Sequence, residues 1–155
     1  MTCDQVDWLR FERLRAAAAM APDPSLARAR LTAALGLWRG EPMLGMDDEL
    51  FLQPLVSRLR EARRSATIGL VDARLALGES HELVGELVEL ARRHPEDAGM
   101  AARHMTALHR AGRPGDALRA GRACMQVTAE SGLLPPRVAI LRVGYLLNLI
   151  IALVR

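Results

Sequence analysis

The fold class is decided by residues 73–125, which read ARLALGESHELVGELVELARRHPEDAGMAARHMTALHRAGRPGDALRAGRACM. Apolar residues recur every three or four positions through this stretch, a spacing typical of amphipathic helices. Gly78 recurs as Gly112 after 34 residues, and the same shift carries Ala73 to Ala107. Each glycine follows an apolar helical pattern, at the place where a left-handed residue ends a helix. The stretch therefore predicts a repeated helix–glycine turn–helix unit.

Thirty-four residues is the period of the tetratricopeptide repeat, whose unit is a pair of helices joined by a turn. The full aromatic pattern of that repeat is missing from both units, so the repeat is degenerate. One helical hairpin cannot bury its apolar face alone and must stack on its neighbours. We expect an all-α fold, built as a tetratricopeptide-like array of antiparallel helical hairpins.

The rest of the chain supports an all-α fold. Half of the residues are hydrophobic but only 3% are aromatic, and Ala, Leu and Arg favour helices. Helices are expected at about 5–20, 24–38, 50–77, 81–94, 97–111 and 114–131. Their inward positions are Trp8, Phe11, Leu14, Ala18; Ala27, Leu31, Ala34, Leu35, Trp38; Leu52, Leu55, Val56, Leu59, Ala66, Leu70, Ala73, Leu77; Leu83, Leu87, Val88, Ala91; Ala101, His104, Met105, Leu108; Ala117, Gly121, Cys124 and Thr128. Asp23 is expected to cap the second helix, with Pro24 as its first residue.

Residue patterns that support catalysis are missing from the sequence. Lys is absent, which excludes a Walker phosphate loop and a Schiff-base enzyme, and no G-x-S-x-G, H-E-x-x-H or C-x-x-C motif occurs. His104 and His109 are five residues apart, so they do not form a metal-binding pair on one helix face. The acidic run at 47–49 is interpreted as a complement to a helix dipole rather than a metal site. We expect no enzyme activity, no cofactor, no metal site and reduced intracellular cysteines.

The basic residues raise a second possibility, direct binding of nucleic acid. All 21 are Arg, yet the net charge is only +3. Arg58, Arg60, Arg63 and Arg64 lie close together in the sequence, and Arg60 and Arg64 share a helix face, but Glu61 interrupts the group and no aromatic residue is interleaved. A solvated helix surface is the preferred interpretation. Weak nucleic-acid binding through this Arg-rich surface is the alternative.

The stretch LTAALGLWRGEPMLGM at 31–46 resembles the A-L-x-L-W-R-G-x-P-L loop of the bacterial transcriptional activator domain. This domain occurs in the actinobacterial antibiotic regulatory proteins, which activate secondary-metabolite genes. The similarity continues through RLREARRSATIGLVDARLALG at 58–78, ELVGELVELARRHP at 82–95 and MTALHRAGRPGDALRAGR at 105–122. It covers about residues 5–132, and the combined motifs are specific.

The resemblance implies a cytoplasmic protein-interaction and dimerisation domain in transcriptional regulation. The expected partner is another regulator, RNA polymerase or a second copy in a homodimer, with DNA contacted only indirectly and no membrane contact. The family's winged-helix DNA-binding domain normally precedes this domain, but here Met1 opens the first helix. We therefore expect a stand-alone relative, a fragment or a product that pairs with a complete regulator. Arg103 and His104, on the first helix of the second repeat, are the candidate partner-binding residues.

Two stretches depart from the family pattern. Ala98-Gly99 stands where the family has a charged Arg-Glu pair, and the family's polar ending is replaced by LLPPRVAILRVGYLLNLIIALVR. A helix over 138–154 would be about 25 Å long, short of the roughly 30 Å hydrocarbon core, and contains Arg142. We expect a repeat domain at 1–132 and an atypical apolar helix at 133–155. The helix is expected to pack into the domain or pair with a second copy rather than touch lipid; a shifted reading frame would also explain this ending.

Overall fold

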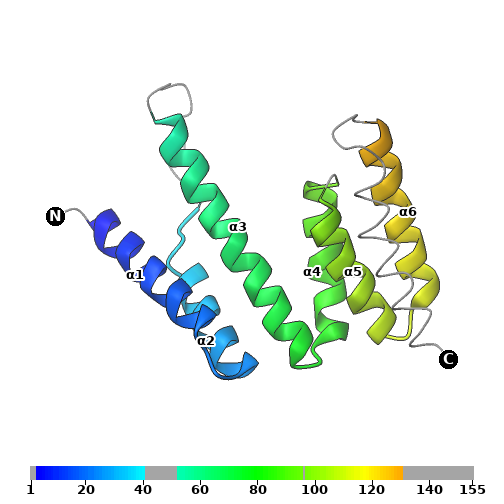
Figure 1. Cartoon of the computed structure of the whole chain (residues 1–155), viewed down its shortest axis with the longest axis horizontal. Coiled ribbons are helices and arrows are strands. Elements are labelled where there is room, and N and C mark those ends of the chain that lie inside the picture. The colour runs from blue at the N-terminus through cyan, green and yellow to red at the C-terminus, as the bar shows by residue number, and fades with distance from the viewer. Residues whose placement is uncertain (1–2, 41–51, 96, 131–155) are drawn as a thin grey trace. The chain divides into compact units, whose positions relative to one another are not determined.

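The computed structural model describes residues 3–40, 52–95 and 97–130. Its elements are α1 (Cys3–Ala19), α2 (Pro24–Leu35), α3 (Gln53–Ala76), α4 (Ser80–Arg93), α5 (Ala98–Arg110) and α6 (Pro114–Glu130). The chain divides into two compact units, residues 1–77 with α1–α3 and residues 78–155 with α4–α6 (Figure 1). Every regular element in the described residues is helical, which confirms the predicted all-α array of helical hairpins.

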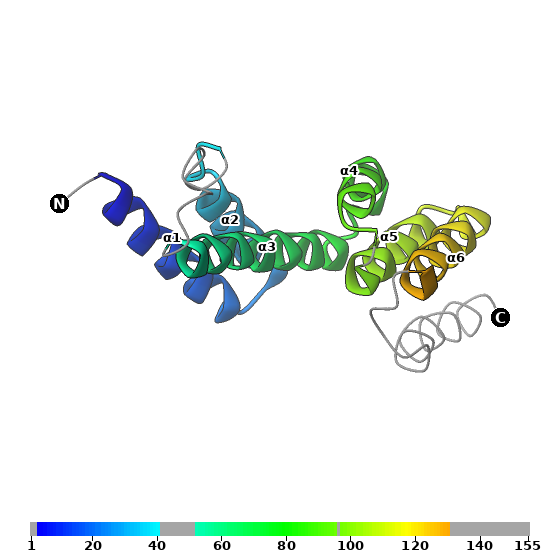
Figure 2. The same cartoon turned by 90° about the horizontal axis from the view of Figure 1, so that it is seen from above.

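In unit 1, α2 packs against α1 on one side and against α3 on the other (Figures 1 and 2). The core of unit 1 contains the buried side chains of Phe11, Ala18, Leu31, Ala34 and Ala66. Further apolar side chains pack around them half-buried, namely Trp8, Leu14, Leu35, Leu37, Trp38, Ala62 and Leu70. Apolar residues at three- and four-residue spacing thus close a three-helix core, as the periodicity predicts.

In unit 2, α5 is the central helix and packs against both α4 and α6. All four of its predicted inward residues are buried: Ala101, His104, Met105 and Leu108. Leu83 and Leu87 of α4 and Ala117 and Cys124 of α6 bury the facing sides. The central position of α5 explains why its apolar face is broader than a simple stripe, since Met100 and Ala107 are buried as well.

The predicted caps are present at the N-terminus of α2 and at the C-termini of α3 and α5. Asp23 lies in an extended conformation and its Oδ1 accepts a 2.9 Å hydrogen bond from the Leu26 amide. Gly78 and Gly112 adopt φ of +84° and +74°, in the left-handed region that ends a helix at little cost for glycine. Asp97, for which the sequence pattern predicted no role, caps α5 by accepting from the amides of Gly99 and Met100.

Several predicted positions are wrong in detail. The second helix ends at Leu35 rather than Trp38, because the Leu37 and Trp38 amides donate to carbonyls three residues back, which tightens the backbone into turns. Leu55, Leu77 and Val88, predicted to face inward, are 43%, 39% and 44% exposed. Leu77 follows the last residue of α3, and at all three positions the helical period does not say which neighbouring segment covers the side chain.

Some sequence predictions fall outside the described residues. These are the acidic turn at 47–49, the apolar helix expected at 133–155 and the inward side chain of Thr128. Within the described residues, no helix from α1 to α6 is long and apolar enough to cross a bilayer.

Candidate partner-binding site

Arg103 and His104 are neighbours on α5 but lie in different surroundings. The half-buried Arg103 side chain turns back along its own helix, where Nη1 donates a 2.9 Å hydrogen bond to the Gly99 carbonyl. His104 is only 9% exposed and lies in the core of unit 2. The two side chains therefore do not form one surface patch, and a partner-binding role for them stays a prediction.

The buried imidazole of His104 has an unusual environment. Its Nε2 atom is buried and has no hydrogen-bond partner. Removal from water lowers the pKa of His104 below its ordinary value of 6.5, and the positive charge of Arg113 lowers the pKa further. Burial and the charge of Arg113 therefore both favour the neutral form of His104.

His104 also lines a cavity, here called the unit 2 cavity, of about 270 Å³. Ala91 of α4, Ala101 and His104 of α5, and Cys124 and Val127 of α6 are among the residues around it. Three helices therefore contribute its walls, and His104 is a polar residue within a mostly apolar lining. The described residues hold no group of three or more His, Cys, Asp or Glu side chains placed to bind a metal ion.

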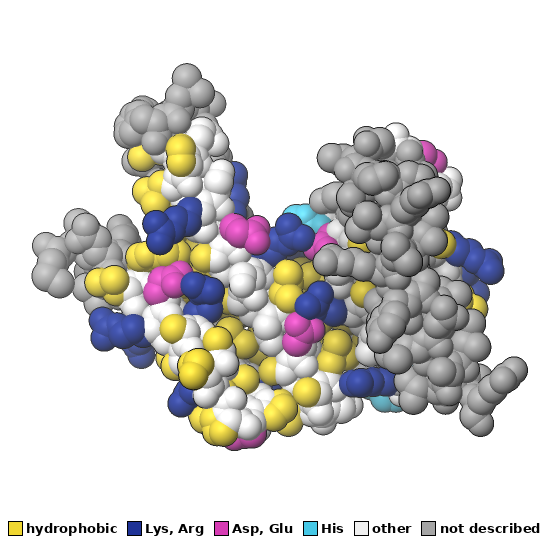
Figure 3. Space-filling model, in the orientation of Figure 1, with side chains coloured by type: hydrophobic (Ala, Val, Ile, Leu, Met, Phe, Trp, Pro, Cys, Tyr) yellow, Lys and Arg dark blue, Asp and Glu magenta, His cyan; other side chains and the backbone are white. Residues whose placement is uncertain are grey.

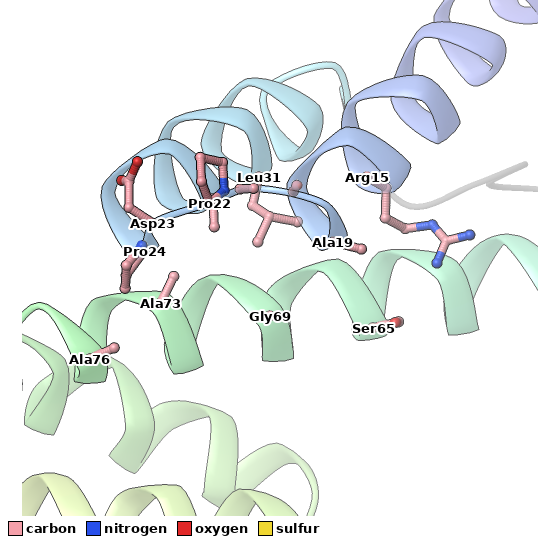
Figure 4. Close-up of a pocket in the computed structure, with 13 residues that line it drawn as sticks. Arg15, Ala19, Pro22, Asp23, Pro24, Leu31, Ser65, Gly69, Ala73 and Ala76 are labelled. Atoms are coloured by element: carbon pink, nitrogen blue, oxygen red, sulfur yellow. The ribbon is translucent and has the colours of Figure 1, made fainter.

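A second cavity lies in unit 1, where the sequence pattern predicted none. This unit 1 groove, of about 440 Å³, is bounded by the end of α1, the turn at 20–23, α2 and α3 (Figure 4). Its lining includes Arg15, Ala19, Asp23, Leu31, Gly69 and Ala73. The available signal was the small-residue run AAAAMAPDP at 16–24, which also occurs in ordinary helix ends and so did not identify a groove.

The Trp38-Arg39-Gly40 segment, which carries the family-like W-R-G motif, attaches to the rest of unit 1. The Trp38 ring meets Phe11 edge-on, with ring centroids 5.3 Å apart and an interplanar angle of 90°. The guanidinium of Arg63 lies 5.4 Å from the centroid of the Trp38 ring, and its Nη1 donates to the Gly40 carbonyl. This motif therefore holds the chain after α2 against α1 and α3.

On the face shown in Figure 3, the basic side chains lie among acidic and apolar side chains. Arg63, which belongs to the Arg-rich surface, lies over the Trp38 ring and donates a hydrogen bond to the Gly40 carbonyl. Elsewhere Arg113 donates a 2.7 Å hydrogen bond to Asp116, a contact that lowers the pKa of this carboxyl, and Arg119 pairs with the same carboxylate. These pairings weaken the field that a nucleic acid would meet.

Comparison with known families and proteins gives a consistent result. The family model described as BTAD, bacterial transcriptional activator domain, matches residues 6–143. The match starts within α1 and extends past residue 132, where the sequence pattern suggested the domain boundary. No solved structure matches the chain.

The chain is also similar to curated regulators. It is 38% identical to the regulatory protein DnrI of Streptomyces peucetius over 95 residues, which are 61% of this chain and 35% of that protein. It is 30% identical to the transcriptional regulator RedD of Streptomyces coelicolor, over 84% of this chain and 38% of that protein. It is 29% identical to the transcriptional regulatory protein EmbR of Mycobacterium bovis, over 83% of this chain and 33% of that protein. The chain thus matches little more than a third of each relative.

Proposed function

Because the chain belongs to the bacterial transcriptional activator domain family, we propose that it is a non-enzymatic protein-interaction and dimerisation domain in the regulation of transcription. The family match over residues 6–143 is the observation that carries this proposal. The names of the relatives support it, since each is a regulatory protein. The target genes we propose are those of secondary metabolism, as the resemblance to antibiotic regulatory proteins implies.

The geometry of the two units supports binding of a protein. In each unit the middle helix packs against both neighbours. Each unit also has an apolar depression, the unit 1 groove of about 440 Å³ and the unit 2 cavity of about 270 Å³. Depressions of this kind accept apolar side chains of a partner, and the polar side chain of His104 is part of the lining in unit 2. In this proposal His104, with Arg103 beside it on α5, contributes to the partner-binding surface.

The partners we propose are a second copy of the chain, another regulator or RNA polymerase, in the cytoplasm. DNA would be reached through a DNA-binding module on the same complex. We also propose that the repeat domain ends at residue 132 and that an atypical apolar segment follows at 133–155.

Weak direct binding of nucleic acid is the second candidate, favoured by the +3 net charge and the 21 Arg residues. The ion pairs of the described residues count against strong binding. Arg15 pairs with Glu12 at 2.7 Å and Arg92 with Glu89 at 3.1 Å, besides the Asp116 pairs. A surface with its cations paired in this way attracts phosphates weakly.

Two measurements on the chain of residues 1–155 test the proposal. Sedimentation velocity across a concentration series should show a reversible monomer–dimer equilibrium. Fluorescence anisotropy with a labelled random-sequence DNA duplex should show only weak binding that is lost steeply as salt rises. A monomer at every concentration would contradict the dimerisation. Sequence-specific DNA binding at physiological salt by this chain alone would favour the second candidate instead.

A further inference from the structure

The unit 1 groove is shaped by small side chains on three helices. On α3, Ser65, Gly69 and Ala73 are four residues apart and so lie on one face. A Cβ at Gly69 would lie 3.2 Å from Leu31 Cδ1, so glycine permits the close approach of α2 to α3. The groove therefore stays open because α1 and α3 flank α2 and carry side chains too short to fill the space between them (Figure 4).

The two ends of the groove carry opposite charges. Figure 4 shows Arg15 near one end and Asp23 near the other, with the alanine-lined part between them. Arg15 pairs with Glu12 through Nη2, while its Nε is buried without a hydrogen-bond partner. The exposed Asp23 uses Oδ1 to cap α2. A basic group of a binding partner would therefore meet Asp23 at one end, and an acidic group at the other end would share the Arg15 guanidinium with Glu12.

A large apolar side chain lies just after α1, in the turn that bounds the groove. Met20 is 83% exposed, more than any other large hydrophobic residue among those the structure describes. Its two chain neighbours, Ala19 and Ala21, both line the groove. Unit 1 thus carries an exposed apolar side chain in the turn that bounds the groove, and methionine adapts well to irregular spaces.

We propose that the unit 1 groove is the self-association surface and that a second copy of this chain occupies it around a two-fold axis. A two-fold interface uses the same surface on both copies, so each contact occurs twice. The opposite charges at the groove ends then match, with Arg15 of each copy facing Asp23 of the other. Met20 of each copy enters the other copy's groove. This inference rests on the proposed dimerisation and assigns it to one surface.

The first test is Met20→Glu in the chain of residues 1–155, with the dimer dissociation constant measured by sedimentation velocity. Two buried methionines per dimer are lost, so the dissociation constant should rise by about a hundredfold or more. Leu9→Glu is the matched control: Leu9 is also on α1, is 53% exposed and does not line the groove. The control should dimerise like the wild type, and circular dichroism should show both variants equally helical.

The outcomes separate the two proposals. A wild-type chain that stays monomeric contradicts dimerisation itself, and this inference with it. A wild-type dimer that Met20→Glu leaves intact, or that Leu9→Glu weakens equally, retains dimerisation but places the interface elsewhere.

A second test addresses the two-fold arrangement of charges. Asn caps helices about as well as Asp, so Arg15→Gln with Asp23→Asn removes the two charges while keeping the α2 cap. Wild-type dimerisation should weaken as salt rises, because the two Arg15–Asp23 pairs are screened. The double variant should dimerise more weakly at low salt and show little salt dependence. If it keeps the wild-type salt dependence, other charges orient the two copies and the arrangement is wrong.

Discussion

Replacing Trp38 by alanine would remove the central contact between the segment after α2 and the rest of unit 1. The indole meets Phe11 edge-on at 5.3 Å, and Phe11, which is 1% exposed, stacks on Trp8 at 5.5 Å. Arg63 covers the Trp38 ring at 5.4 Å. Three segments of unit 1 therefore meet at one aromatic cluster.

The size of the effect follows from these contacts. Truncating a fully buried aromatic residue to alanine costs about 3–5 kcal/mol. Trp38 is half-buried, which reduces the burial contribution, and its buried Nε1 has no hydrogen-bond partner, so its removal relieves about 1 kcal/mol or more. The lost edge-to-face contact costs about 0.5–1.5 kcal/mol. We expect Trp38→Ala to lower the free energy of unfolding by about 2–3 kcal/mol.

Urea unfolding followed by far-ultraviolet circular dichroism measures this loss without relying on the fluorescence of the removed tryptophan. Trp38→Phe should lose less than the alanine variant, because it keeps an aromatic ring against Phe11 and removes the unsatisfied N–H. Arg39→Ala is the control next in the chain: the Arg39 side chain is 88% exposed and should change stability by less than about 0.5 kcal/mol. A cost below about 1 kcal/mol for Trp38→Ala would refute the reasoning, since the cluster would then not support unit 1.

Two further predictions concern unit 2 and the glycines. Because the pKa of folded His104 is lowered, the unfolded chain binds more protons below about pH 6.5. The free energy of unfolding should therefore fall as pH drops from about 6.5 toward the folded pKa. His104→Gln should flatten this part of the plot of unfolding free energy against pH, as measured by urea denaturation. An unchanged slope would mean that the pKa of His104 does not change on folding. Gly85→Ala should raise stability by about 0.5–1 kcal/mol, since an added Cβ there meets nothing, whereas Gly78→Ala, at φ +84°, should lower it by about 1 kcal/mol or more. Thermal melts showing the same sign for both would contradict this assignment.

The sequence alone was sufficient for the class of fold and for several of the helix caps. Helix spacing and end signals act over three to five residues, so the capping roles of Asp23, Gly78 and Gly112 follow from their immediate neighbours in the chain. The inward positions Ala101, His104, Met105 and Leu108 of α5 were predicted for the same reason, because their three- and four-residue spacing is a local pattern. The family resemblance, carried by the motifs at 31–46 and after, was likewise readable from the residues.

Tertiary packing decided the features that depend on distant segments. Val88 and Leu77 follow the apolar period yet are exposed, since periodicity does not say which neighbour covers the edge of a stripe. The role of Trp38 as a contact to Phe11 and Arg63 required α1 and α3 to meet the turn after α2. The unit 1 groove exists only because two helices flank a third while their facing residues are small. In the sequence those residues, such as Ala19 and Ala73, are ordinary helix formers; their separation in space makes them the walls of a groove.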